Sequence, residues 1–176
     1  NMEYLKEQLW PLLADPLIRQ NCHLLPCNGT QYIIPYGDEE VFFNTLSAAF
    51  MEEEIGHQQF NKLMQYLCVL QAELVQEIKD LPLTGNFIQN RDSMINWCPI
   101  GRDATDSDRN IWVELDKKHK IRDAMLRRLF SNPEFENITV KKGGETSFDI
   151  YPNGWDKSYA WNYFSEKDRI YFIGDR

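Results

Sequence analysis

Three arginines lie close together in the middle of the sequence, at Arg91, Arg102 and Arg109. A guanidinium group presents a planar fork of donors that matches the oxygens of a phosphate, so three converging arginines could recognise a phosphorylated small molecule. Spacing alone leaves a second interpretation open, in which all three are solvated surface charges. The chemistry that these residues predict is therefore the binding of a phosphorylated ligand, if they converge.

The segment GGETSFDIYPNGWDK, residues 143–157, begins with a strand that alternates polar and apolar side chains. The period of two places Ser147, Asp149 and Tyr151 on one face of this strand. The other face, with Thr146, Phe148 and Ile150, is predicted to join the core. A hydroxyl beside a carboxylate on the exposed face could bind sugar hydroxyls, or it could simply be the hydrated side of an antiparallel sheet.

Other residue types that could carry chemistry are weaker candidates. Asp106 and Asp108 form a D-x-D pair of the kind that holds Mg²⁺ or supplies a nucleophile, but they lie in a polar segment that we interpret as an acidic loop. The histidines His23, His57 and His119 lack metal-ligand spacing. We expect His57 and His119 near helix N-termini, as surface imidazoles.

The composition limits the classes of protein. The chain has 176 residues, 43% of them hydrophobic, which is enough for a packed core. The 19 Lys and Arg residues against 27 Asp and Glu give a net charge of -8, which argues against general nucleic-acid binding. An anionic ligand must therefore be held by a local group of basic residues.

Two further features bear on the cellular location. No apolar run approaches the roughly 20 residues of a membrane span, and the N-terminal segment lacks the apolar stretch of a signal peptide. The cysteines include no C-x-x-C pair and are interpreted as free thiols in a reducing compartment; they are Cys22, Cys27, Cys68 and Cys98. We therefore expect a cytoplasmic protein without a membrane partner.

The hydrophobic pattern predicts alternating helices and paired strands. Helices are expected over residues 2–14 and 57–80, and after Asp116 as a plausible N-cap. Strands are expected around the turns at Asn28-Gly29, Asp92-Ser93 and Gly143-Gly144, the last pair over 136–142 and 145–151. VFFNTLSAAF, residues 41–50, is left open between a strand and a buried helix. Strand pairs that each follow a helix indicate antiparallel α+β packing with helices on one face.

Three stretches in this order resemble a known family: PIGRDATDSDR, ELDKKHKIR and GGETSFDIYPNGWDK. They are similar to motifs of the eukaryotic-type phosphomannomutases of the haloacid dehalogenase superfamily. With the weaker similarity of LLPCNGTQYII, the resemblance covers most of residues 20–176. It implies an α/β fold in which an antiparallel-sheet cap domain is inserted into an incomplete Rossmann-like core. Residues 1–50 would belong to the core and 51–152 to the cap, and 153–176 would return to the core.

The resemblance also implies a reaction. These enzymes interconvert mannose 6-phosphate and mannose 1-phosphate through an aspartyl-phosphate, with Mg²⁺ and a hexose 1,6-bisphosphate activator. By similarity, Arg91, Arg102 and Arg109 would grip the distal phosphate of the phosphorylated hexose, and Ser147 and Asp149 would contact the ligand. Lys157 would be a catalytic lysine of the core, Asp175 a metal ligand, and Phe87 part of a homodimer interface through the cap.

The sequence also departs from the family pattern. The nucleophile motif D-x-D-G-T is absent, the metal-binding loop is represented only by Asp175, and Asp92-Ser93 replaces an Asn-Gly turn. Because arginines cannot replace a carboxylate nucleophile, we expect this chain to be inactive by itself. Two alternatives stay open: a sugar-phosphate phosphatase on the same scaffold, and a non-catalytic module for sugar-phosphate binding or dimerisation.

Overall fold

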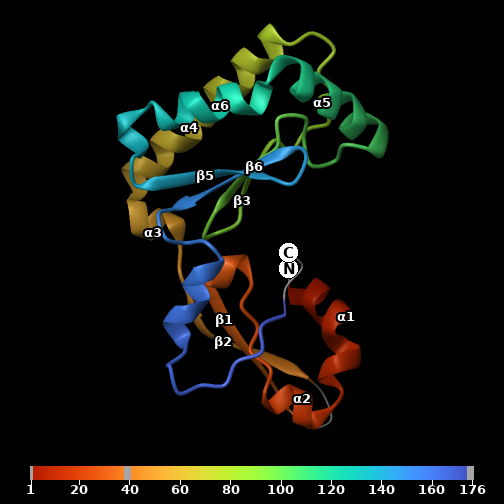
Figure 1. Cartoon of the computed structure of the whole chain (residues 1–176), viewed down its shortest axis with the longest axis vertical. Helices are drawn as coiled ribbons and strands as arrows, with labels where there is room; N and C mark the ends of the chain where they lie inside the picture. Colours follow the sequence, from red (N-terminus) through yellow and green to blue (C-terminus); the bar gives the residue numbers. More distant parts are fainter. Residues whose placement is uncertain (1, 38–40, 174–176) are drawn as a thin grey trace. The chain divides into compact units, whose positions relative to one another are not determined.

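A computed structural model describes residues 2–37 and 41–173 of the chain (Figure 1). The chain divides into two compact units. Unit 1 comprises Asn1–Ala48 and Trp155–Arg176, and unit 2 comprises Ala49–Gly154. Each unit is described by itself.

Unit 1 contains a two-stranded antiparallel sheet with short helices around it. Its elements are α1 (Met2–Leu13), α2 (Pro16–Gln20), the 3₁₀ turn η1 (Cys27–Gly29), β1 (Gln31–Tyr36), β2 (Phe42–Ala48) and the 3₁₀ segment η3 (Lys157–Tyr163). The predicted first helix is confirmed, and the segment left open between helix and strand is strand β2. The acidic stretch 38–40 lies outside the described residues.

The Asn28-Gly29 turn is fixed by its backbone. Both residues have positive φ, 60° for Asn28 and 85° for Gly29. A Cβ on Gly29 would lie 2.7 Å from the backbone nitrogen of Ala160, so η1 packs directly against η3. Of the two strands expected around this turn, the second forms as β1. In place of the first strand, Leu24 alone pairs with Ile33 as an isolated bridge.

Unit 2 is a four-stranded antiparallel sheet with helices on one face, as Figure 1 shows. Its elements are α3 (Met51–Ile55), α4 (His57–Glu77), β3 (Ile88–Asn90), β4 (Ile95–Trp97), α5 (Asp106–His119), α6 (Ile121–Phe130), η2 (Pro133–Phe135), β5 (Ile138–Gly143) and β6 (Ser147–Pro152). The strand order is β3-β4-β6-β5. The expected mixed fold class with an antiparallel sheet is confirmed.

The core of unit 2 lies between this sheet and its helices. Phe148 stacks on Trp97 with ring centroids 4.9 Å apart, and both side chains are fully buried. Helix α4 confirms the helix predicted over residues 57–80, and its apolar side is buried against this layer at Phe60, Leu63, Leu67, Leu70 and Leu74. Burial of these large side chains is the main favourable contribution to the stability of the unit. Because the helices cover this face of the sheet, a ligand could reach only the opposite face.

The helix expected after Asp116 is confirmed as α6, whose buried residues are Ile121, Met125 and Leu129, but its N-cap is Lys120 and not Asp116. The preceding helix α5 was not predicted; it begins at Asp106, with Thr105 as its N-cap. Thr105 and Asp108 form a reciprocal capping box, so the expected acidic loop is the first turn of a helix. α6 begins at Ile121 after Lys120, which has a left-handed backbone and separates the two helices.

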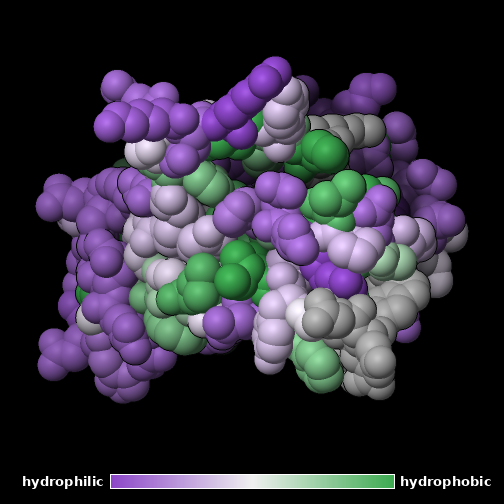
Figure 2. All heavy atoms as spheres, turned by 90° about the horizontal axis from the view of Figure 1, so that it is seen from below, coloured by the Kyte–Doolittle hydropathy of each residue, from purple (hydrophilic) through white to green (hydrophobic). Residues whose placement is uncertain are grey.

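The surface carries apolar side chains in small groups among polar ones, as Figure 2 shows for one face. Exposed large examples in unit 1 are Leu12, Leu17, Ile18, Tyr36, Phe42 and Leu46. Among the described helices, none combines the length and the apolar character needed to cross a membrane.

Candidate functional site

A row of polar residues crosses the sheet of unit 2. Gln89 on β3 pairs with Asn96 on β4, Asn96 pairs with Asp149 on β6, and Asp149 pairs with Lys141 on β5. Residues directly opposite each other in antiparallel strands project from the same face. Their sequence neighbours Ile95, Trp97, Phe148 and Ile150 enter the core beneath the helices, so this row lies on the opposite face. We call these four residues the polar row.

The centre of the polar row is one hydrogen bond between side chains. Asn96 Nδ2 donates to Asp149 Oδ1 at 2.8 Å and, more weakly, to the Phe148 carbonyl oxygen at 3.4 Å. Asn96 is only 2% exposed, and its Oδ1 has no hydrogen-bond partner among the described residues. The two acceptors near Nδ2 define which way the amide points.

Gly143 leaves room for the carboxylate of Asp149 on the other side. A Cβ added at Gly143 would lie 2.7 Å from Asp149 Oδ2 and 2.9 Å from its Cγ. Such contacts are too close for a side chain at this position without a shift of Asp149. The carboxylate is therefore held between Asn96 and the backbone of β5, and it remains partly exposed.

The face that carries Ser147, Asp149 and Tyr151 is not the hydrated side of a sheet, which was one of the two interpretations of the sequence. Ser147 and Tyr151 are each only 4% exposed, and Asp149 alone of the three is partly accessible. Ser147 Oγ donates to the Gly143 carbonyl oxygen at 2.8 Å, so this hydroxyl stabilises the hairpin. The alternation of polar and apolar residues along β6 assigned its side chains to the correct faces of the sheet. It could not reveal that the side chains on both faces are largely buried.

Two helices hold the connection between β5 and β6. Trp112 Nε1 on α5 donates to the Glu145 carbonyl oxygen at 3.0 Å. Arg122 Nη1 on α6 donates to the Gly144 carbonyl oxygen at 2.9 Å. These bonds fix the turn that places Gly143 opposite Ser147, and so they support the position of Asp149 two residues further along.

The three arginines occupy different places on unit 2. Arg91 Nε donates to Gln89 Oε1 at 2.9 Å, which places its guanidinium beside the polar row. Arg102 is exposed in the loop after β4. Arg109 lies in the first turns of α5, where its Nε donates to the Ala104 carbonyl oxygen at 3.2 Å. The structure thus joins Arg91 to the row through its hydrogen bond with Gln89, and convergence of the three arginines on one ligand stays a prediction.

The remaining predicted residues lie elsewhere. Lys157 is exposed at the start of η3 in unit 1. Phe87 is half-buried, and its carbonyl oxygen accepts from Cys98 N at 2.7 Å. Asp175 lies outside the described residues. The prediction for the histidines is right for His57, the first residue of α4, and wrong for His119, the last residue of α5.

The residues do not assemble a metal site in the part that the structure describes. No group of three or more His, Cys, Asp and Glu side chains there is arranged to hold an ion. Asp108 is committed to capping, since it accepts from Thr105 N at 2.9 Å and from Thr105 Oγ at 2.6 Å. These hydrogen bonds lower the pKa of Asp108 below its ordinary value. No Mg²⁺ ligand is therefore assigned within the described residues.

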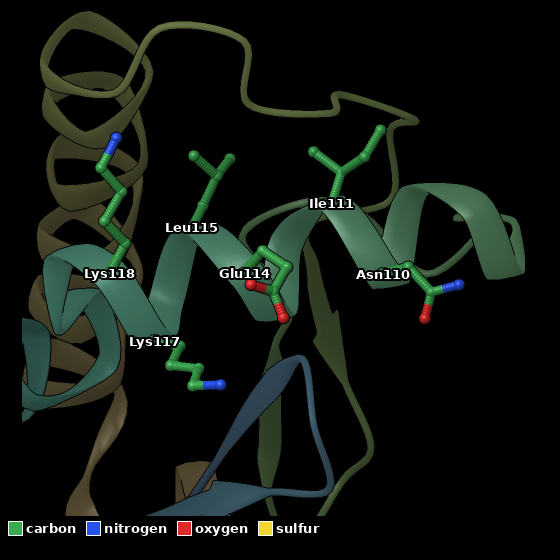
Figure 3. A pocket seen from close by; sticks show the side chains of 6 residues that line it. All are labelled: Asn110, Ile111, Glu114, Leu115, Lys117 and Lys118. Atoms are coloured by element: carbon green, nitrogen blue, oxygen red, sulfur yellow. The ribbon is translucent and has the colours of Figure 1, made fainter.

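Two pockets in unit 2 lie apart from the polar row. One of about 740 Å³ runs along α5, where Ile111 and Leu115 project to the same side of the helix, as Figure 3 shows. The other, of about 480 Å³, is lined by Glu52, Glu53 and Asp92 among other residues. The acidic lining of the second disfavours an anionic ligand. The lining of neither pocket includes a residue of the polar row.

Sequence reasoning missed Asn96, Gln89 and Gly143 as members of this site. A signal for Asn96 was present, because it is the one amide within the apolar run MINWC. A polar residue in a strand that is otherwise buried is informative, since it needs a partner or a purpose.

Comparison with known proteins finds one family model and several relatives that match the chain. The family described as "Eukaryotic phosphomannomutase" matches residues 12–176. A phosphomannomutase of Nicotiana benthamiana is 32% identical over 151 residues, which are 85% of this chain and 56% of that protein. A phosphomannomutase of Drosophila melanogaster is 33% identical over 126 residues, 69% of this chain and 48% of that protein. The chain therefore spans about half the length of the curated relatives it matches.

Proposed function

The chain belongs to the eukaryotic phosphomannomutase family, and we propose that it binds a phosphorylated hexose on the polar row for the interconversion of mannose 6-phosphate and mannose 1-phosphate. The observation that carries this proposal is the series of side chains Arg91, Gln89, Asn96 and Asp149 on one face of the sheet. A guanidinium suits a phosphate, and a carboxylate suits sugar hydroxyls. Both groups are supplied by the same sheet.

The proposed reaction requires a ligand that binds in two directions. A hexose bisphosphate must present first one phosphate and then the other to the reacting centre, so the groups that hold the distant end must accept either orientation. Arg91, Arg102 and Arg109 would neutralise whichever phosphate is distant. Asp149 accepts hydrogen bonds only, and any sugar hydroxyl can donate to it. These residue types suit a clamp that tolerates both ends of one ligand.

We assign different tasks to the two units. Unit 2 would be the cap that holds the sugar phosphate, and unit 1 would belong to the core that carries the covalent chemistry. Lys157, an exposed residue of unit 1, would neutralise charge near the phosphorylated aspartate. Ser147 would act through the hairpin that it stabilises as well as through any contact with the ligand.

The covalent step is not assigned to a described residue. The family resemblance implies an aspartyl-phosphate, Mg²⁺ and a hexose 1,6-bisphosphate activator, but residues 2–37 and 41–173 do not supply a metal-ligand set. We therefore derive no step through the ion.

The cytoplasmic location and the homodimer through the cap are part of the same proposal. Free thiols at all four cysteines support the cytoplasmic location.

A coupled assay tests this function. Mannose 1-phosphate is supplied with and without glucose 1,6-bisphosphate, and formation of mannose 6-phosphate and release of inorganic phosphate are both measured. The proposed function predicts isomerisation that depends on the bisphosphate. Phosphate release without isomerisation would support a phosphatase, and binding without either product would support a non-catalytic module.

A further inference from the structure

We infer that Asn96 and Gly143 are positioning residues that hold the Asp149 carboxylate in one orientation for the ligand. This inference rests on the proposed function, because that function supplies the phosphorylated hexose as ligand. It goes further by assigning a task to Asn96, which lies outside the three family motifs, and a steric reason to Gly143, the first residue of the motif GGETSFDIYPNGWDK. Neither residue needs to touch the ligand.

The first reason is geometric. Asn96 Nδ2 donates to Asp149 Oδ1 at 2.8 Å, and Asp149 Oδ2 occupies the space that a Cβ of Gly143 would take. One oxygen of the carboxylate is thus held by a donor, and the other is accommodated by the absence of a side chain. Rotation of the carboxylate in either direction would break the bond or bring it against β5.

The second reason is the cost of this arrangement to the fold. Asn96 is 2% exposed between the fully buried Ile95 and Trp97, and its Oδ1 has no partner among the described residues. A buried carbonyl oxygen without a hydrogen bond destabilises a protein, and nearly all such groups are paired in native structures. A leucine has the same branching at Cγ and carries no polar atom that could be left unpaired. Stability therefore does not account for an asparagine at this position, whereas orientation of Asp149 does.

The third reason is the advantage to binding. A carboxylate that is already oriented loses little freedom when it accepts hydrogen bonds from a ligand, so more of the interaction appears as affinity. Asp149 is partly exposed, which leaves it accessible from the same face. A freely rotating carboxylate at this place would bind the same hydroxyls more weakly.

The test measures binding of glucose 1,6-bisphosphate by calorimetry together with thermal unfolding. Asn96→Leu should still fold, as a cooperative thermal transition would show, and weaken binding by about tenfold. In an Asp149→Ala background the same change should alter affinity by less than about twofold, because its effect passes through Asp149. Gly143→Ala should show the same pattern by displacing the carboxylate from the other side.

A matched control is Thr139→Val. Thr139 is also polar, lies on the same face opposite Tyr151, and donates from its hydroxyl to Asn153 Oδ1 at 2.7 Å. This nearly isosteric change should alter affinity by less than about twofold. A loss as large as that of Asn96→Leu would overturn the inference, because it would mean that any polar group of this face matters equally.

The outcomes separate the two proposals. If the unmodified chain does not bind the bisphosphate, the proposed function fails. If the chain binds it and folded Asn96→Leu and Gly143→Ala bind equally well, the function stands and the positioning inference is overturned. If Asn96→Leu does not fold, Gly143→Ala with and without Asp149→Ala decides the question. A ligand-free check is the side-chain amide resonance of Asn96, which should shift in Asp149→Ala; an unchanged resonance contradicts the contact.

Discussion

Asp116 and Arg122 are joined by two hydrogen bonds across the break between α5 and α6. The Arg122 backbone N–H donates to Asp116 Oδ1 at 2.8 Å, and its Nε donates to Oδ2 at 2.7 Å. Because Arg122 also binds the Gly144 carbonyl oxygen, the pair ties both helices to the turn between β5 and β6. Asp116 thus secures the start of α6 from within α5, although it is not the N-cap predicted from the sequence.

Loss of this pair should destabilise unit 2. Asp116→Ala should lower the free energy of unfolding by about 3 kcal/mol, because it leaves the Arg122 guanidinium largely buried without its counter-ion. The two side chains are only 12% and 14% exposed. Denaturant unfolding measures the change. Asp123→Ala, which removes a more exposed pair with Lys142, should cost much less, and equal losses would contradict this account.

The capping box of α5 should respond to pH. Hydrogen bonds from the Thr105 hydroxyl and backbone lower the pKa of Asp108 in the folded state. The resulting stabilisation is therefore present above the ordinary carboxyl pKa and is lost as the pH falls through the lowered value. Thr105→Ala should raise the pKa of Asp108 toward its ordinary value, while Thr105→Ser should preserve it. A carboxyl NMR titration decides, and the same pKa in Thr105→Ala as in the unmodified chain would refute the assignment.

Arg109 should contribute a salt-dependent part of ligand affinity. Arg109→Ala should weaken the binding of glucose 1,6-bisphosphate by about tenfold at low ionic strength, since a charge-assisted contact is lost. The difference should shrink as salt is added. Calorimetry at two salt concentrations measures it. Arg127→Ala, an exposed arginine on α6, is the matched control, and similar behaviour of both variants would return Arg109 to the class of solvated surface charges.

The proposed homodimer through the cap gives a prediction for Phe87. Phe87→Glu should shift the chain from dimer to monomer in sedimentation velocity, because a charge would enter an interface that an aromatic side chain helps to form. Phe130→Glu is the control, since Phe130 is 62% exposed at the end of α6. A monomeric unmodified chain, or a dimer that survives Phe87→Glu, would remove Phe87 from this role.

The sequence predicted the elements that have strong patterns. The apolar stripe of α4 and the hairpin turn at Asp92 were correct because burial and turn chemistry both leave clear local signals. α5 was missed because Trp112 is its only buried residue in the described structure, so its apolar period is too weak to recognise. The T-x-x-D capping pattern at Thr105 was the available signal.

The site was predictable only in part. Asp149 and Arg91 could be named from motifs, but their link through Asn96 and Gln89 depends on the register of three strands. Register is set by contacts between distant segments, and a single sequence does not reveal it. The steric role of Gly143 has the same origin, because it concerns the approach of a side chain from the neighbouring strand.

The most direct test of the central claim is an NMR titration of the isotope-labelled chain with glucose 1,6-bisphosphate. If the polar row binds the sugar phosphate, the largest shifts should fall on the backbone amides of residues 89–96 and 141–149 and on the Nε–H of Arg91. Asp149→Ala should reduce these shifts at equal ligand concentration. Shifts centred on the α5 pocket around Ile111, or no shifts at all, would contradict the account.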